Sequence, residues 1–523
     1  MRHFRSVFCA VLYCAVPTSH LAAATNPNII FIMADDQGFG DVSALNQESK
    51  IRTPNIDRIA KEGMVFSDGH SSSSVCTPTR YSVLTGRYHW RTHLQKGVLG
   101  GFSKPLISPG RLTVASLLKQ HGYATACIGK WHLGWDWPLK AGGTANDGGD
   151  FSGGFKAGWD VDYTGKIQNG PCDLGFDYFF GISASLDMPP YVYVRNRTPT
   201  EPATVEKAFH RKGPAAAGFE AVDVLPTITR ETVQFIDENA ESDNPFFVYF
   251  PLNAPHTPIV PTGEWEGQSG INRYGDFTMQ VDWTVGQVLK AIDDNGISEN
   301  TLVIFTTDNG CSPAAKIPEL GAAGHDHNYI YRGHKADIFE GGHRVPFVAR
   351  WPAKVKPGSR TDQLVGQLDL LATAAQIVGA TVAEDEGEDS VSFLPVLLGE
   401  NSTAARRGLR TSIVSQSIGG QFAIRDGDWK LCLCPGSGGW SEPRPGRLDM
   451  TKMPPIQLFN LAHDPGEKNN LQADHPDRVT NMKDMLSEII SNGRSTTGAR
   501  LKNDAKIVMI KPIAKPRAKR KRK

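Results

Sequence analysis

The 523-residue sequence contains no run of about 18 apolar residues beyond its N-terminus, so an integral membrane protein is excluded. Its eight cysteines are too few for a dense disulfide framework, and their spacing matches no zinc pattern. An excess of charge of one sign is lacking as well, because 56 Lys and Arg stand against 55 Asp and Glu. This balance argues against a strongly basic or acidic molecule, but the charge is unevenly distributed along the chain.

What the sequence does contain is typical of a folded globular protein. Its residues are 40% hydrophobic and 21% charged. Glycine is abundant, at 53 residues, which favours a loop-rich construction. At about 150 residues per domain, the length predicts two to three domains. We find no internal repeat in the sequence, so nothing indicates a solenoid.

The first 24 residues have the composition of a secretory signal peptide. Arg2 and Arg5 supply a positive start, residues 7–16 a short apolar core, and residues 22–24 a small-residue cleavage site. A buried N-terminal helix is the alternative, but the apolar segment is short for one. We therefore expect residues 1–24 to be removed and the protein to be exported, either to the periplasm or out of the cell. Two cysteines leave with this segment, and no disulfide pairing can be deduced for the other six.

The opposite end of the chain is basic. Residues 506–523 contain nine Lys and Arg and no acid, a composition typical of a solvated, disordered tail. Adhesion to a polyanion or an anionic surface is the functional alternative. When the nine charges of the tail and the two of the leader are subtracted from the formal net charge of +1, residues 25–505 carry −10. The folded body is therefore expected to be acidic.

Continuous apolar segments alternate with segments of helical spacing over most of the chain. The apolar segments are typical of buried parallel strands and lie at residues 28–34, 123–128, 245–252 and 301–306. The helical segments lie at residues 55–64, 112–121, 225–240 and 277–295. This alternation predicts an α/β domain, placed at residues 25–404, in which a large, mostly parallel sheet lies between layers of helices.

From about residue 405 the pattern changes. Residues 422–433 predict a hairpin, residues 457–461 another short strand, and residues 475–491 a helix. We therefore expect a smaller C-terminal α+β domain at residues 405–505, with a short antiparallel sheet. Within the larger domain, residues 141–171 are glycine-rich and without periodicity, which predicts a long loop that is functional or disordered.

Polar side chains follow each of the four predicted parallel strands, at the point where the strand ends. Asp35 and Asp36 follow the first, Lys130 and His132 the second, His256 the third, and Asp308 and Asn309 the fourth. Ligands bind outside the carboxyl ends of the strands in open α/β sheets. These residues therefore predict one common site.

The chemistry of this site is indicated by two motifs. The first is Cys76-Thr77-Pro78-Thr79-Arg80 followed by Thr85-Gly86, and the second is Gly122-Tyr123-Ala124-Thr125 followed by Gly129-Lys130-Trp131-His132. Together they resemble the two signatures of the formylglycine-dependent (type I) sulfatases of the alkaline phosphatase superfamily. The resemblance extends over most of residues 27–490. It implies an alkaline-phosphatase-like fold, with a large mixed sheet between helices and a small C-terminal domain.

The resemblance also implies a mechanism. Cys76 would be oxidised to formylglycine by a sulfatase-maturing enzyme, and one hydroxyl of the hydrated aldehyde would attack sulfur. The second hydroxyl would then expel sulfate, with His132 as its base. His256 and Lys335 would contact the sulfate and help to protonate the leaving alcohol, while Arg80 and Lys130 would hold the formylglycine and the sulfate. Without the motif, Cys76 would be interpreted as a small buried thiol.

The residues also predict a metal site. Asp35, Asp36, Asp308 and Asn309 offer only oxygen ligands, which suit Ca²⁺ or Mg²⁺ and not zinc. The resemblance implies one calcium ion, which the modified Cys76 would also contact. Taken alone, Asp35 and Asp36 would be interpreted as a solvated turn or a helix cap.

Candidates for substrate contacts are less specific. His325, His327, His334 and His343 fall in one segment after the Asp308 strand, where they either line the pocket mouth or are solvated loop residues. Asp187 lies in a turn that resembles a segment of carbohydrate sulfatases, which implies a contact with a substrate hydroxyl. Three tryptophans offer either a stacking platform or core packing: Trp131, Trp135 and Trp137.

Three functions are compatible with these patterns. The first is an exported sulfatase acting on a sulfated carbohydrate or an aryl sulfate. The second is a phosphonate or phosphate monoester hydrolase with the same formylglycine site, because tetrahedral oxyanions differ little in shape. The third is a non-catalytic homologue that keeps Cys76 unmodified and binds polyanions through its basic tail. Neither nucleic acid nor a membrane span is expected among its partners.

Overall fold

The computed structural model describes residues 26–145, 158–400 and 408–512. The predicted signal peptide at residues 1–24 lies outside these ranges. So do residues 146–157 of the glycine-rich segment and residues 513–523 of the basic tail.

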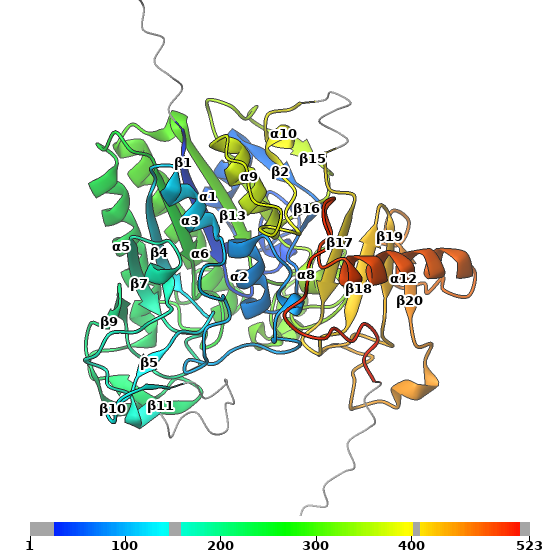
Figure 1. Ribbon diagram of the computed structural model, residues 1–523, viewed down its shortest axis with the longest axis horizontal. Helices are drawn as coiled ribbons and strands as arrows, with labels where there is room; N and C mark the ends of the chain where they lie inside the picture. Colours follow the sequence, from blue (N-terminus) through cyan, green and yellow to red (C-terminus); the bar gives the residue numbers. More distant parts are fainter. Residues whose placement is uncertain (1–25, 146–157, 401–407, 513–523) are drawn as a thin grey trace, which may run out of the picture.

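A ten-stranded sheet forms the centre of the molecule (Figure 1), in the order β15-β2-β14-β13-β1-β12-β4-β7-β8-β9. Its five middle strands are mutually parallel, and they are β13 (Thr301–Thr307), β1 (Asn28–Ala34), β12 (Phe246–Pro251), β4 (Ala124–Lys130) and β7 (Tyr178–Ile182). The outer strands add antiparallel pairs and are β14 (Phe347–Arg350), β2 (Met64–Phe66), β15 (Ser359–Thr361), β8 (Val194–Arg195) and β9 (Thr198–Pro199). The predicted mixed, mostly parallel sheet is confirmed.

The parallel strands are continuous apolar segments because they are buried on both faces. Ile30 of β1 lies between Val248 of β12 and Val303 of β13, and all three side chains are fully buried. This register brings the ends of β1, β12 and β13 to the same edge of the sheet.

Two groups of helices pack in the domain. One contains α1 (Pro54–Glu62), α5 (Val224–Asn239) and α6 (Arg273–Asp294), and the other contains α2 (Cys76–Thr85), α3 (Val114–Gln120) and α9 (Leu370–Ile377). Helix α6 begins four residues before the predicted start. The reason is Asn272, whose side chain accepts hydrogen bonds from the Tyr274 and Gly275 N–H groups and caps the helix.

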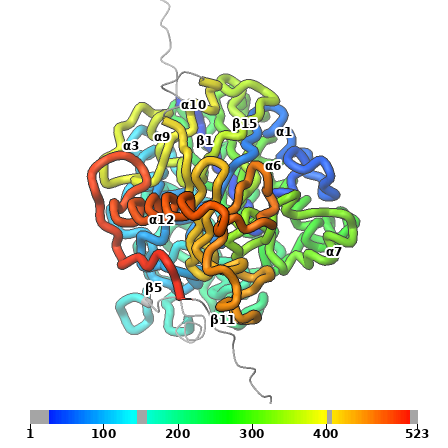
Figure 2. The backbone as a smooth tube through the Cα atoms, turned by 90° about the vertical axis from the view of Figure 1, so that its right-hand side faces the viewer, coloured from blue at the N-terminus to red at the C-terminus, as the bar shows by residue number. Residues whose placement is uncertain are grey.

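The C-terminal domain contains a four-stranded antiparallel sheet made of β17 (Ser412–Gln416), β18 (Phe422–Asp426), β19 (Trp429–Cys432) and β20 (Gln457–Asn460). Helix α12 (Pro476–Ser491) packs on β18 and β19, and Figure 2 shows it running across this side of the molecule. The predicted hairpin, third strand and helix are present, and β17 is a strand that the sequence did not reveal.

The small sheet is joined directly to the segment that precedes Cys76. Ser73 forms a parallel bridge with Gln416 at the end of β17. The Gln416 carbonyl accepts hydrogen bonds from the Ser74 N–H at 3.0 Å and the Ser73 hydroxyl at 3.1 Å. The C-terminal domain therefore forms part of the support for the predicted nucleophile.

The beginning of the basic tail differs from the prediction. Ile507 and Met509 pack against the apolar core between the small sheet and α12, so the first residues of the segment at 506–523 are packed and not disordered. Ile507 and Met509 alternate with the exposed Lys506, Val508 and Ile510, and partial burial of these two side chains holds this part in place.

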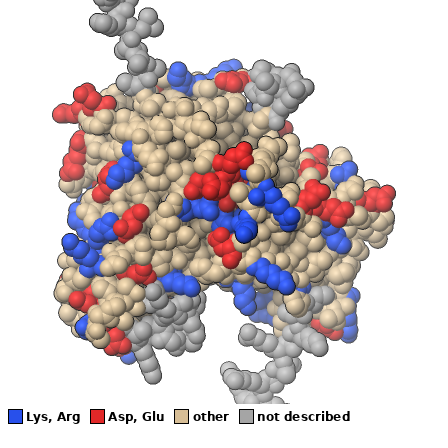
Figure 3. Space-filling model, in the orientation of Figure 1, with Lys and Arg blue, Asp and Glu red and all other residues tan. Residues whose placement is uncertain are grey.

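Charged side chains of both signs are interspersed on the face shown in Figure 3. Within the described part of the chain, no helix combines the length and the apolar character needed to cross a membrane.

Candidate active site

The polar residues that follow the parallel strands meet at one edge of the sheet, as the sequence predicted. Lys130 Nζ lies 2.6 Å from Asp35 Oδ2, which joins the ends of β4 and β1. The Asp36 N–H donates to Asp308 Oδ1 at 3.2 Å, which joins the ends of β1 and β13. All of these side chains are buried. The strand ends therefore form one charged cluster inside the protein.

Two further predicted residues reach this cluster from outside the strands. Arg80, on α2, donates to Asp308 Oδ2 at 2.7 Å and to the Lys130 carbonyl at 3.1 Å. Lys335 Nζ lies 2.6 Å from Asp36 Oδ1. His256 completes the set, with Nε2 at 3.6 Å from Asp36 Oδ2. Four of the six predicted catalytic residues thus contact the predicted aspartate ligands: Arg80, Lys130, His256 and Lys335.

The predicted metal ligands have oxygen atoms that fit a hard cation. Asp35 Oδ1, Asp36 Oδ2 and Asn309 Oδ1 are buried and accept no hydrogen bond from any described residue. One ligand atom each from Asp35, Asp308 and Cys76 also lies within 4.8 Å of the others. Buried polar atoms are rarely left without a partner, so these oxygens indicate a bound group. Carboxylate and amide oxygens suit Ca²⁺ or Mg²⁺.

Cys76 is the first residue of α2 and only 2% exposed. The N-terminus of a helix favours negative charge, because free backbone N–H groups point outward there. Burial nevertheless raises the pKa of the Cys76 thiol, although Lys130 and Lys335 oppose the shift. The unmodified side chain is therefore a neutral thiol and a poor nucleophile.

His132 has the geometry of a base. Its Nε2 lies 2.8 Å from the Leu99 carbonyl, which can only accept, so Nε2 carries the proton. Nδ1 is left without a proton and has no hydrogen-bond partner among the described groups. Burial, together with Lys130 and Arg80, lowers the pKa of His132 well below its usual value of 6.5. The imidazole is therefore neutral and able to accept a proton.

The pKa values of the two aspartates that face the basic residues are shifted in opposite directions. Burial opposes ionisation of Asp35, but Lys130, His256, Arg80 and Lys335 hold its pKa well below the usual value. Burial and the nearby Asp35 instead raise the pKa of Asp308 to about 6. The site without a cation therefore holds closely spaced carboxylates, and a bound cation would relieve their repulsion.

The structure corrects the prediction for His325, which does not line a pocket mouth. Its side chain is buried, with Nε2 2.7 Å from Asp41 Oδ1, and Nδ1 accepts from the Lys50 N–H at 3.2 Å. The sequence missed Asp41 and Tyr274, which share this cluster. The signal available was weak, namely a third acidic residue five positions after Asp36.

The other predicted histidines have different environments. His327 Nε2 is buried and lacks a partner among the described residues, and burial lowers its pKa to about 4. His334 Nδ1 lies 2.9 Å from the Lys335 carbonyl, so His334 adjoins a catalytic residue. His343 is buried in a separate cluster, 3.2 Å from His70 and 3.0 Å from Lys430 Nζ, and does not reach the strand ends.

Asp187 lies five residues beyond the end of β7, the strand next to β4. Its Oδ2 is paired with Arg211, which the sequence did not single out, and its buried Oδ1 has no described partner. The predicted tryptophan platform is not present, because Trp131, Trp135 and Trp137 are each at most 1% exposed and pack in the core.

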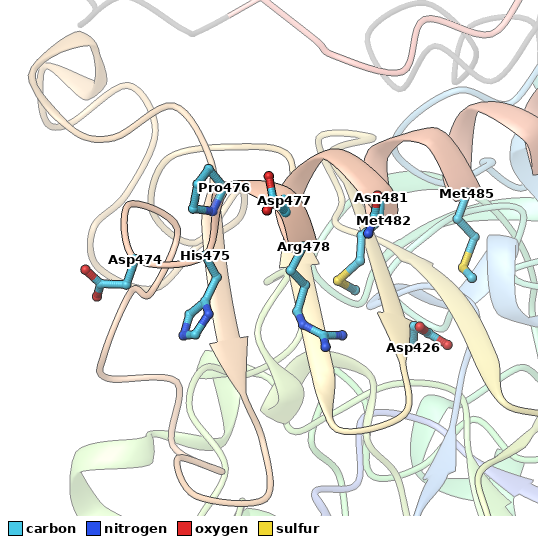
Figure 4. A pocket seen from close by; sticks show the side chains of 9 residues that line it. All are labelled: Asp426, Asp474, His475, Pro476, Asp477, Arg478, Asn481, Met482 and Met485. Atoms are coloured by element: carbon cyan, nitrogen blue, oxygen red, sulfur yellow. The ribbon is translucent and has the colours of Figure 1, made fainter.

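A cavity of about 420 Å³ lies apart from the strand ends, on the C-terminal domain. Figure 4 shows Pro476, Asp477 and Arg478 at the start of α12, together with Asp426 at the end of β18. It contains none of the predicted catalytic or metal-binding residues.

A comparison with known families agrees with the geometry of the strand ends. The family model described as Sulfatase matches residues 27–380. The chain belongs to the sulfatase family. Members of this family hydrolyse sulfuric esters, and the Cys76 motif and the carboxylate cluster both lie inside the matched segment.

Similar proteins extend the match to nearly the whole chain. An N-acetylgalactosamine-6-O-sulfatase from Bacteroides thetaiotaomicron is 33% identical, over 88% of this chain and 93% of its own length. Human arylsulfatase A is 31% identical, over 86% and 84% of the two chains. A solved structure from a study of glycosaminoglycan metabolism by Bacteroides thetaiotaomicron superposes with a TM-score of 0.75 at 32% identity, covering 89% of this chain and 99% of the other. This sulfatase therefore shares both domains with its relatives.

Proposed function

We propose that this protein is an exported sulfatase that removes sulfate from a sulfated carbohydrate, through a formylglycine made from Cys76. The observation that carries the proposal is the position of Cys76, at the start of α2 and beside Lys130, Lys335 and a carboxylate cluster. A buried neutral thiol has little nucleophilic strength, so chemical conversion of this residue supplies what the site lacks.

The surrounding residues then have separate tasks. Lys130 and Lys335 place two positive charges beside the α2 N-terminus, where they neutralise a bound sulfate. Although burial opposes the shift, Asp36 and the other nearby acids raise the pKa of Lys335, so Lys335 stays charged. Its main task is therefore to stabilise the charge of the sulfate, and proton donation to the leaving alcohol is secondary.

Proton transfer falls to the two histidines. The free Nδ1 of His132 accepts a proton from the modified Cys76 side chain. His256 has its Nδ1 2.6 Å from the Thr257 carbonyl, so Nδ1 carries a proton and Nε2 faces Asp36. Nε2 donates to the leaving alcohol from the doubly protonated imidazolium form.

A calcium ion fits the oxygen donors of Asp35, Asp36, Asp308 and Asn309. When bound, such a cation polarises a sulfate oxygen and adds positive charge to the site. Its presence would also satisfy the three oxygens that lack partners.

A carbohydrate substrate is supported by the relative from Bacteroides thetaiotaomicron, which is named as an N-acetylgalactosamine-6-O-sulfatase. The Asp187–Arg211 pair offers a hydrogen-bond acceptor and a hydrogen-bond donor in the segments that follow β7. Strand β7 pairs with β4, whose end carries Lys130 and His132. The Asp187–Arg211 pair suits sugar hydroxyl groups.

Intact-mass measurement of protein co-produced with a sulfatase-maturing enzyme tests the proposal. The expected mass is that of a chain starting at residue 25, less about 18 Da, because the Cys76 thiol becomes an aldehyde. This material should release sulfate from 6-O-sulfated N-acetylgalactosamine or a related sulfated sugar, and a Cys76→Ala variant should not. Full turnover by Cys76→Ala would refute the mechanism, and a preference for nitrophenyl phosphonate over nitrophenyl sulfate esters would refute the substrate class.

A further inference from the structure

The segment after β1 holds a predicted metal ligand in an unusual backbone conformation. Asp36 has a φ of 69°, in the left-handed region that residues other than glycine rarely adopt. Such a conformation is unfavourable for a residue with a Cβ and persists only where the surrounding structure enforces it. The contacts that enforce it here therefore bear on how Asp36 presents its carboxylate.

A buried cluster of three residues lies directly behind this segment. The Asp41 carboxylate accepts hydrogen bonds from the Gly38 N–H at 2.6 Å, from His325 Nε2 at 2.7 Å and from the Tyr274 hydroxyl. Asp41 and His325 are at most 1% exposed, and Tyr274 is 2% exposed. We call Asp41, Tyr274 and His325 the Asp41 cluster.

The Asp41 cluster touches Asp36 itself. The Tyr274 hydroxyl lies 3.1 Å from the Asp36 carbonyl, between that oxygen and Asp41. The hydroxyl carries a single proton, which lies between these two acceptors. The backbone of Asp36 is thereby contacted by Tyr274, while its carboxylate contacts Lys335 and Asn309.

The three members come from distant parts of the chain. Tyr274 is in the first turn of α6, and His325 lies in the segment after β13. Two glycines allow the close approach that joins these parts, because a Cβ at Gly38 or Gly40 would lie about 2 Å from the carbonyl oxygen of His327 or Asp326. The segment 36–41 is thus fixed against α6 and against residues 325–327.

We infer that the Asp41 cluster positions Asp36 and thereby sets the affinity of the site for its divalent cation. The inference rests on the proposed metal site of this sulfatase. His325 and Tyr274 are positioning residues in this scheme, since they act through Asp41 and the Asp36 backbone and touch neither the cation nor the substrate. Residues that orient metal ligands typically change metal affinity by about 10–100-fold when replaced.

The inference is tested by titrating Ca²⁺ into the metal-depleted full-length Tyr274→Phe and His325→Gln variants and measuring the affinity by calorimetry. Each variant should bind Ca²⁺ about tenfold more weakly than the unaltered protein. Saturating Ca²⁺ should restore kcat, which loss of a merely structural contact would not predict. Tyr123→Phe is the matched control: it removes a buried hydroxyl bond to the Pro27 carbonyl, at the start of β4 and away from the strand ends. It should leave Ca²⁺ affinity unchanged.

Each outcome bears on one claim. Unaltered Ca²⁺ affinity in both variants overturns the inference and leaves the proposed function intact, because binding is measured without turnover. Lower affinity with an equal fall in Tyr123→Phe also overturns it, since the effect would then be general destabilisation. Absence of Ca²⁺ and Mg²⁺ binding to the unaltered protein overturns the inference together with the proposed metal site.

Discussion

His132 combines a constrained backbone with a fixed tautomer. Its φ of 56° lies in the left-handed region, and its Nε2 is bonded to the Leu99 carbonyl. The Leu99 N–H in turn lies 3.2 Å from the Thr77 hydroxyl, next to Cys76. His132 and the segment that begins with Cys76 are therefore held by one short chain of hydrogen bonds, which fixes the direction of the Nδ1 proposed as the base.

Replacement of His132 by Asn should separate catalysis from folding. Asn tolerates a left-handed backbone, so we expect Tm to change little. The proton acceptor is lost, and kcat should fall by about 10²–10⁴-fold with a smaller change in KM. Steady-state kinetics with a sulfated sugar, alongside thermal unfolding, provide the measurement. A variant that retains kcat would show that another group accepts the proton.

A short helix connects the C-terminal sheet with the active-site segments. Helix α8 (Glu340–His343) receives Lys430 of β19, whose Nζ lies 3.0 Å from Glu340 Oε1 and 2.8 Å from Glu467 Oε1. The carbonyl of Gly342 in the same helix accepts from the Gly310 N–H at 3.0 Å, one residue after Asn309. Lys430 therefore anchors an element that abuts the metal-binding segment.

Loss of the Lys430 charge should destabilise the folded protein through its contact with α8. Lys430→Met leaves buried Glu467 without its cation and Glu340 with Arg344 as its remaining one, and we expect the free energy of unfolding to fall by about 3–5 kcal/mol. Urea denaturation gives the value. A matched Lys430→Met/Glu467→Gln double variant should recover part of the loss, because one buried charge has been removed. Equal losses in the single and double variants would contradict the assigned charge pairing.

The strands that the sequence predicted correctly are those in which consecutive residues are apolar because both faces are buried. β1, β4, β12 and β13 are buried on both faces, so each is a continuous apolar segment. β17 has only two apolar residues, Ile413 and Val414, between polar ones, and gave no such signal. At the site, local motifs identified Cys76 and His132, whereas the partner of His325 lies 284 residues away. Sequence patterns carry local periodicity, and contacts over such separations depend on how the chain folds.

Buried neutral histidines give the whole molecule a pH-dependent stability. Burial lowers the pKa of His89 to about 3 and that of His327 to about 4, and it also lowers those of His70, His132 and His343. In the unfolded chain these groups would bind protons near the usual value of 6.5. The unfolded state therefore binds more protons below that pH, and acid favours unfolding.

Stability should accordingly fall as the pH drops below 6.5 towards 4. Each histidine that stays neutral only in the folded state contributes about 1.4 kcal/mol per pH unit. Denaturation curves at several pH values would measure how steeply the free energy of unfolding depends on pH. His89→Gln should make this dependence shallower by the contribution of one histidine. A stability that is flat between pH 6.5 and 4 would contradict the assigned burial of these side chains as neutral groups.

The bridge between Ser73 and Gln416 also has a consequence for the order in which the protein is made. The carbonyl that fixes Ser74, two residues before Cys76, belongs to a residue synthesised 342 positions later. At about 5–20 residues per second, synthesis leaves the Cys76 segment without this partner for tens of seconds. Under the proposed function, a maturing enzyme would have this interval to reach the thiol, before Gln416 pairs with Ser73 and Ser74.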